Sequence, residues 1–123
     1  VENSNKNTVF SLEERVVLVK KSLENIKNIE VIPFSGLLVD FATKLNAKVI
    51  LRGLRVVSDF EYEFQMSSMN KKLNNNIESI FLTPSESYAF LSSSLVKEIA
   101  QLGGDISAFV NEDVKIALEK KYK

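Results

Sequence analysis

Two arginines only three residues apart, Arg52 and Arg55, follow an apolar run in the segment LRGLRVVSDFEYE, residues 51–63. Arginine forms planar, bidentate hydrogen bonds with phosphate and carboxylate groups, and like charges this close repel unless an anion lies beside them. Gly53 between them lets a backbone or a ligand approach closely. The segment indicates either a clamp for a polyphosphate or two internal ion pairs, and the residues alone leave both open. The available carboxylates are Asp59, Glu61 and Glu63.

A second candidate anion site is the run of three serines at residues 92–94. At the start of a helix, free backbone N–H groups and the positive end of the helix dipole attract anions. Ordinary capping, which needs one serine, is the alternative. Two further side chains, Tyr88 and Phe90, can stack on a nucleotide base or belong to the core. Lys6 lies in a polar loop, where a lysine is most often solvated.

Helix and strand patterns alternate along the chain. Strands are predicted at 29–34, 48–51 and 77–83. Helices are predicted at 11–26, 36–47, 58–73, 92–102 and 112–122. Capping patterns support three of the helix starts, with Ser11 and Glu14, Ser58 and Glu61, and Asn111. This order predicts an α/β fold, a doubly wound parallel sheet, in a single domain over residues 1–123.

The predicted topology places both candidate anion sites at one edge of the sheet. Ligands of open parallel sheets bind beyond the carboxyl ends of the strands, and residues 52–55 and 83–94 each follow a strand. This shared edge favours phosphate binding by both segments. Three strands make a thin sheet, so one or two further strands are expected upstream of Val1.

Composition excludes several classes of function. Sixteen basic and sixteen acidic residues give no net charge, which disfavours nucleic acid and anionic membranes as partners. The sequence has no cysteine and no histidine, so disulfides, thiolate zinc sites and histidine acid–base chemistry are excluded. There is no apolar run of about 18 residues and no signal-peptide pattern, which predicts a cytoplasmic protein without a membrane span.

Three segments, FSLEER (10–15), LRGLRVVSDFEYE (51–63) and FLSSSLVKEIA (90–100), closely resemble the bacterial phosphopantetheine adenylyltransferases. These belong to the nucleotidyltransferase superfamily with a Rossmann-like fold. The resemblance implies transfer of the adenylyl group of ATP to 4′-phosphopantetheine, giving dephospho-CoA and pyrophosphate in coenzyme A biosynthesis. It also implies Mg²⁺ held mainly by the ATP phosphates, contacts with coenzyme A and a homo-oligomer, the hexamer usual in the family.

The resemblance also implies roles for individual residues. Lys6 and Arg52 match positions that hold phosphopantetheine and the reacting phosphates, and the backbone at Leu38 matches a substrate contact. The matched ATP-binding positions are Gly53, Leu54, Arg55, Glu63, Tyr88, Ala89, Phe90, Leu91, Ser92, Ser93 and Ser94. The implied mechanism is an in-line attack of the substrate phosphate on the α-phosphorus of ATP, without a covalent enzyme intermediate or a protein base.

One departure from the family pattern limits the expected activity. The family begins with a strand and a T/H-x-G-H loop whose histidine contacts the ATP phosphates, and this sequence contains no histidine. That N-terminal region is expected upstream of Val1, so the 123-residue chain as written supplies no catalytic residue and is expected to have little activity. The alternatives are a non-catalytic nucleotide- or CoA-binding module and a related nucleotidyltransferase with another substrate.

Overall fold

The computed structural model describes residues 8–123, with residues 57 and 58 described through their backbone only. The chain divides into two compact units. Unit 1 joins Val1–Ser35 to Leu91–Lys123, and unit 2 comprises Gly36–Phe90. The single domain over residues 1–123 stays a prediction.

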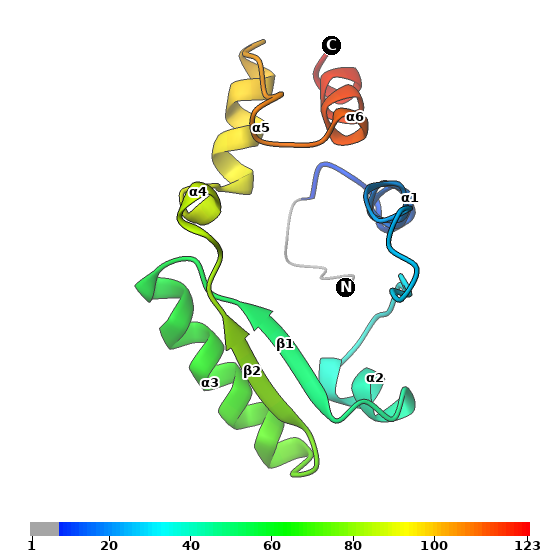
Figure 1. Cartoon of the computed structure of the whole chain (residues 1–123), viewed down its shortest axis with the longest axis vertical. Coiled ribbons are helices and arrows are strands. Elements are labelled where there is room, and N and C mark those ends of the chain that lie inside the picture. Colours follow the sequence, from blue (N-terminus) through cyan, green and yellow to red (C-terminus); the bar gives the residue numbers. More distant parts are fainter. Residues whose placement is uncertain (1–7) are drawn as a thin grey trace. The chain divides into compact units, whose positions relative to one another are not determined.

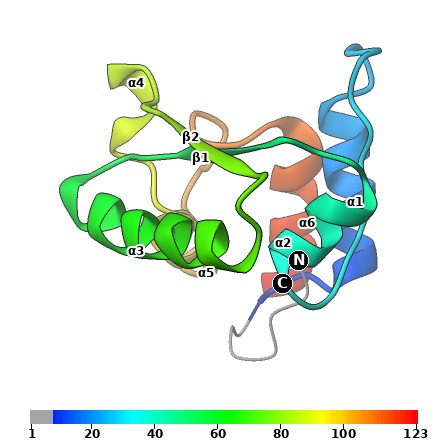
Figure 2. The ribbon, with the colours of Figure 1, turned by 90° about the horizontal axis from the view of Figure 1, so that it is seen from below.

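Unit 2 is built around two parallel strands, β1 (Val49–Gly53) and β2 (Glu78–Leu82), joined by the long helix α3 (Val57–Leu73) (Figure 1). Figure 2 shows α3 lying along one face of the strand pair. Parallel strands joined by a helical crossover are the repeating element of Rossmann-like, doubly wound α/β folds. The predicted fold class is therefore confirmed.

The register of the two strands brings the segments after them to one edge. Val49 pairs with Glu78 at one end of the ladder and Gly53 pairs with Leu82 at the other. The Leu54 N–H continues the ladder by donating to the Leu82 carbonyl at 2.9 Å. Residues 54–56 and 83–85 thus leave from the same carboxyl edge, as expected from the sequence.

A helix before β1 supplies two of the four buried residues of the core described in unit 2. Val39 and Ala42 of α2 (Leu38–Lys44) pack with Ile50 of β1 and with Ile77. The helix is shorter than the predicted 36–47. Gly36 has φ of 92° and Asn46 has φ of 54°, and neither value is compatible with a continuing right-handed helix.

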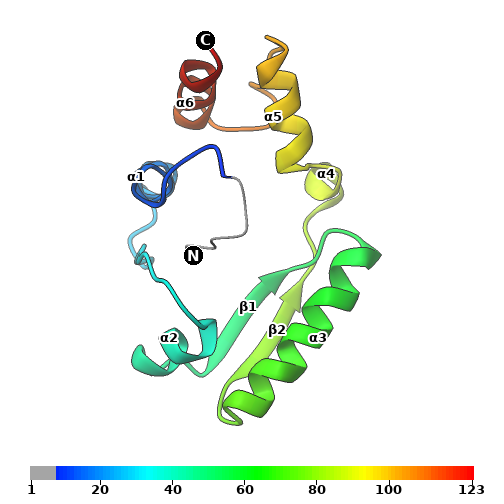
Figure 3. The same ribbon diagram turned by 180° about the vertical axis from the view of Figure 1, so that it is seen from behind.

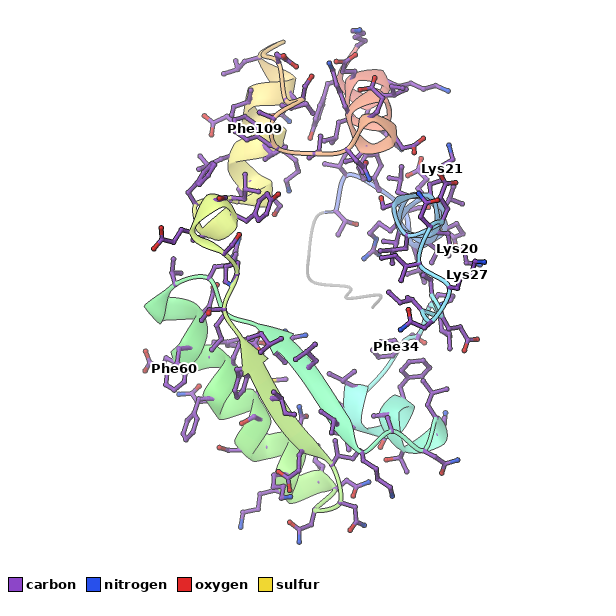
Figure 4. All side chains as sticks on the ribbon, viewed as in Figure 1. Lys20, Lys21, Lys27, Phe34, Phe60 and Phe109 are labelled. Atoms are coloured by element: carbon purple, nitrogen blue, oxygen red, sulfur yellow. The ribbon has the colours of Figure 1, made fainter. Side chains whose placement is uncertain are left out.

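The described residues of unit 1 form three helices, α1 (Leu12–Ser22), α5 (Ser93–Gln101) and α6 (Glu112–Tyr122), seen from behind in Figure 3. Two predicted caps are present. The Ser11 hydroxyl accepts from the Glu14 N–H, the Glu14 carboxylate accepts from the Ser11 N–H, and the Asn111 side chain accepts from the N–H of Val114. Figure 4 labels Lys21 on α1, and its ammonium lies 3.0 Å from Asp113 on α6.

The core of unit 1 holds α5 in place. Val96 and Ala100 of α5 are buried with Leu118 of α6 and with Ile106, which is fully buried. The predicted stop after α5 is present, since Gly103 has φ of 75° and the N–H of Gly104 donates to the Ile99 carbonyl at 2.9 Å. This is the glycine-ended cap expected of such a helix.

Three further predicted elements differ in the structure, and the first is the helix predicted at 11–26, which ends at Ser22. Residues 29–34 form no strand, because a strand is stable only when its backbone groups pair with a neighbour, and the sheet of the described residues contains β1 and β2 alone. The helix expected to start at the Ser58 cap begins earlier, with Val56 as its N-cap. The short helix α4 (Glu86–Ala89) was not predicted. No helix in the described part of the chain is long and apolar enough to cross a membrane.

Candidate functional site

Arg52, the last but one residue of β1, forms a bidentate ion pair with Glu63 of α3. Its Nε donates to Glu63 Oε2 at 2.8 Å and its Nη2 donates to Oε1 at 2.5 Å. Glu63 is only 12% exposed, whereas the Arg52 side chain remains 45% exposed. The hydrogen bonds from Arg52 lower the pKa of Glu63, and the same bonds raise the pKa of Arg52. Both groups are therefore charged at neutral pH.

Arg55 is paired with the carboxylate one helical turn before Glu63. Asp59 Oδ2 accepts from the Arg55 backbone N–H at 3.3 Å and from Arg55 Nε at 3.2 Å. One carboxylate oxygen thus contacts both the main chain and the side chain of the loop after β1. The close pair of arginines is neutralised by two carboxylates spaced four residues apart on α3, as in the ion-pair alternative of the sequence.

A small cavity of about 80 Å³ gathers three of the predicted site residues in unit 2. Leu38 comes from α2, Arg52 from β1 and Glu63 from α3, and all three line it. A larger cavity of about 530 Å³ lies against α1 and α6, and none of the predicted site residues lines it. The chemistry of the linings, rather than cavity size, therefore selects the smaller cavity as the candidate site.

Six further residues line the small cavity and were not identified from the sequence. They are Tyr62, Met66, Ser67, Asn70, Ser79 and Phe81. Four of them lie on α3 at helical spacing from Asp59 and Glu63, so the 3.6-residue period could have identified them. Another face of α3 carries Phe60, whose ring stacks on Phe64 with centroids 5.8 Å apart. Figure 4 shows Phe60 on the side of α3 turned away from the strands.

The other predicted residues of unit 2 follow the carboxyl edge of the strands. A Cβ built at Gly53 would meet no atom within 4 Å, so space is open beside it. Leu54 and Ala89 are half-buried. Tyr88 and Phe90 are 62% and 66% exposed, which excludes the core alternative for both rings in this structure.

The predicted residues of unit 1 lie at the start of α5. Ser92 is its N-cap residue and makes no capping hydrogen bond through its side chain, and Ser93 and Ser94 are exposed in the first turn. Leu91 precedes this start and is half-buried. Whether the start of α5 shares one site with the arginines stays a prediction. Lys6 lies outside the described residues.

A metal site made of protein ligands is not found in the described residues. No group of three or more histidine, cysteine, aspartate or glutamate side chains among residues 8–123 could hold a metal ion. The two carboxylates of the site, Asp59 and Glu63, are paired with arginines.

Comparisons with known proteins match most or all of this chain. The model of the Cytidylyltransferase-like family matches residues 1–99. The phosphopantetheine adenylyltransferase of Staphylococcus haemolyticus (strain JCSC1435) is 50% identical over 123 residues, which are 100% of this chain and 76% of that protein. The phosphopantetheine adenylyltransferase of Staphylococcus carnosus (strain TM300) is 52% identical over 122 residues, 99% of this chain and 76% of that protein.

Proposed function

The chain belongs to the Cytidylyltransferase-like family, and from this premise we propose that it transfers the adenylyl group of ATP to 4′-phosphopantetheine. The products are dephospho-CoA and pyrophosphate. The relatives that are 50% and 52% identical across nearly the whole chain carry the name of this activity, which supports the proposal. The resemblance of the LRGLRVVSDFEYE segment to the same enzymes points to the same reaction.

The observation that carries the proposal is the cavity shared by Leu38, Arg52 and Glu63. Arg52 presents a guanidinium that is held on one edge by Glu63 and is still 45% exposed. A guanidinium has five N–H donors, so two bonds to Glu63 leave three, on Nη1 and Nη2, for a phosphate. The apolar side chains of Leu38, Met66 and Phe81 beside it suit the uncharged arm of a phosphorylated substrate.

Arg55 and the strand edge are proposed to hold ATP. In the reaction, an oxygen of the substrate phosphate attacks the α-phosphorus of ATP, a new P–O bond forms, and the bond from that phosphorus to the β-phosphate oxygen breaks. The electron pair leaves with pyrophosphate, and no enzyme group is covalently modified. Arg52 and Arg55 would bind and orient the two phosphate groups and offset their mutual repulsion, which lowers the barrier without a protein base.

Further parts of the proposal start from the resemblance to the phosphopantetheine adenylyltransferases. We propose the exposed rings of Tyr88 and Phe90 as a platform for the base of ATP, and the start of α5 in unit 1 as an ATP-binding segment. Because the described residues offer no ligand cluster, a Mg²⁺ ion would be bound through the ATP phosphates and would offset their charge. A homo-oligomer, a hexamer as in the family, and contacts with coenzyme A are also proposed.

The proposal is tested by assaying the complete gene product for pyrophosphate and dephospho-CoA formation from ATP and 4′-phosphopantetheine. We expect saturable formation of both products in equal amounts. Binding of ATP and phosphopantetheine without product would identify a non-catalytic binding module instead. Binding of ATP and turnover with a different phosphorylated substrate, such as a pyridine mononucleotide, would identify a related nucleotidyltransferase.

Replacing Gly53 with alanine tests whether ATP approaches the strand edge. The free energy of unfolding is expected to stay within about 0.5 kcal/mol of the wild type, since the added Cβ meets nothing within 4 Å. The binding free energy of ATP is expected to weaken by about 1–2 kcal/mol, because the methyl group occupies the space proposed for the ligand. Chemical denaturation and calorimetric titration measure the two quantities. An unchanged ATP affinity would contradict the placement of ATP beside Gly53.

A further inference from the structure

The two carboxylates of the candidate site lie on one face of α3, one helical turn apart. Asp59 is 29% exposed and Glu63 is 12% exposed, and each contacts a different arginine of the 52–55 segment. Both carboxylates use the Nε edge of their arginine. Bonds on that edge fix the plane of a guanidinium, and in Arg52 they leave the two N–H groups of Nη1 and the second N–H of Nη2 for another acceptor.

We propose that Asp59 and Glu63 are positioning residues, with Asp59 orienting Arg55 toward ATP and Glu63 orienting Arg52 toward the phosphate of 4′-phosphopantetheine. The proposal rests on the proposed function. It adds Asp59 to the site, and it gives Glu63 a role toward phosphopantetheine beside the ATP contact implied by the family resemblance. The structure supports this role because both Glu63 oxygens accept from Arg52, at 2.8 and 2.5 Å.

The position of each carboxylate suits this role. Asp59 lies in the first turn of α3. One of its two carboxylate oxygens, Oδ2, accepts from both the backbone N–H and the Nε of Arg55. It therefore restrains the loop and the side chain together. Glu63 is the less exposed of the two, and it lines the same cavity as Arg52. A carboxylate that is largely shielded from water and bonded in a bidentate way restrains a guanidinium more strongly than a solvated one.

Two other roles are possible for these carboxylates. As simple structural groups, Asp59 would favour the helix dipole and both pairs would add little stability, as is usual for exposed ion pairs. As competitors, the carboxylates would occupy the arginines and be displaced by phosphate. A structural role predicts no effect specific to one substrate, and competition predicts tighter binding when the carboxylate is neutralised.

The test compares Asp59→Asn and Glu63→Gln in the complete gene product, titrated separately with ATP and with 4′-phosphopantetheine. Asp59→Asn is expected to raise the Kd of ATP by about 3- to 10-fold and to leave the Kd of phosphopantetheine within twofold. Glu63→Gln is expected to raise the Kd of phosphopantetheine by about the same factor. In kinetics, each variant should raise the KM of its own substrate more than it lowers kcat.

The matched control is Glu61→Gln, which removes the same charge from the same helix. Glu61 is exposed and forms no ion pair with the residues that the structure describes. We expect both Kd values to stay within twofold. Asp59→Asn and Glu61→Gln should melt within about 4 °C of the wild type, because the Arg55–Asp59 pair is partly exposed and contributes little stability, and Glu61 forms no ion pair with the described residues. Asp59→Glu, which restores the charge, should recover part of the ATP affinity.

Defined outcomes overturn the proposal. If Glu63→Gln weakens ATP and not phosphopantetheine, Glu63 acts on ATP directly and not through Arg52. If either variant tightens binding, the carboxylate competes with phosphate. If Asp59→Asn still weakens ATP binding in an Arg55→Ala background, Asp59 does not act through the Arg55 side chain. Failure of the wild type to bind either substrate would overturn the proposed function itself, and this inference with it.

Discussion

Replacing Arg52 with alanine is expected to lower kcat/KM for 4′-phosphopantetheine by about 30- to 900-fold, equivalent to about 2–4 kcal/mol of lost transition-state stabilisation. Two losses add in this variant. The substrate phosphate loses a charge-assisted, bidentate partner. Glu63, 12% exposed, is left with its charge unpaired in the wall of the cavity, where it repels the incoming phosphate. Steady-state kinetics of the complete gene product with ATP held saturating measure this effect.

The second of these losses can be separated from the first. In the double variant Arg52→Ala with Glu63→Gln, the unpaired charge of Glu63 is removed, and the Arg52 guanidinium is still missing. We expect this variant to recover any stability lost by Arg52→Ala and to recover only a small part of kcat/KM. Arg52→Lys keeps the positive charge but loses the planar, bidentate guanidinium. Its kcat/KM should lie between those of the wild type and Arg52→Ala. Activity within twofold of the wild type for Arg52→Ala would show that Arg52 does not hold the substrate.

The helix ends that were predicted correctly are those encoded by neighbouring residues. The caps at Ser11 and Asn111 and the stop at Gly103 depend on a side chain or a φ angle within a few positions, so short patterns identify them. The strand predicted at 29–34 fails for the opposite reason. Its residues favour extended backbone, but a strand also needs a partner at long range, which no local pattern supplies.

Residue types and topology predicted part of the candidate site. The arginines at the end of β1 and the carboxylates on α3 can be recognised as possible partners, but sequence alone left ion pairing and a phosphate clamp open. The structure shows which carboxylate pairs with which arginine, and the choice depends on the separation of strand and helix. An arginine held on one edge and exposed on the other is compatible with both interpretations, so the two alternatives are not exclusive.

The cavity residues on α3 illustrate a different limit. Tyr62, Met66 and Asn70 share the helical spacing of Glu63, but a periodic stripe on a helix is more often core than site. Only the packing of α3 against the strands turns this stripe into a cavity wall. The sequence therefore contained the signal for these residues without a reason to assign them to a site.

Replacing Ile106 with alanine is expected to lower the free energy of unfolding by about 2–5 kcal/mol, the largest effect on stability that we predict. Ile106 is fully buried between α5 and α6, in contact with the buried cluster that includes Val96, Ala100 and Leu118. Removing its outer carbons leaves a void in a core with few other buried side chains, so the helices can fill it only in part. Denaturant-induced unfolding measures the change.

Ile116→Ala provides a matched control, because the same atoms are removed from a side chain of α6 that is 56% exposed. We expect a change within about 0.5 kcal/mol, since alanine favours a helix and little buried surface is lost. Because Val96 and Ala100 hold α5 from the same core, Ile106→Ala should also weaken amide protection in α5. This would show that the buried core of unit 1 restrains the helix whose start is proposed to bind ATP. Equal destabilisation by the two substitutions would instead show that Ile106 is not the centre of that core.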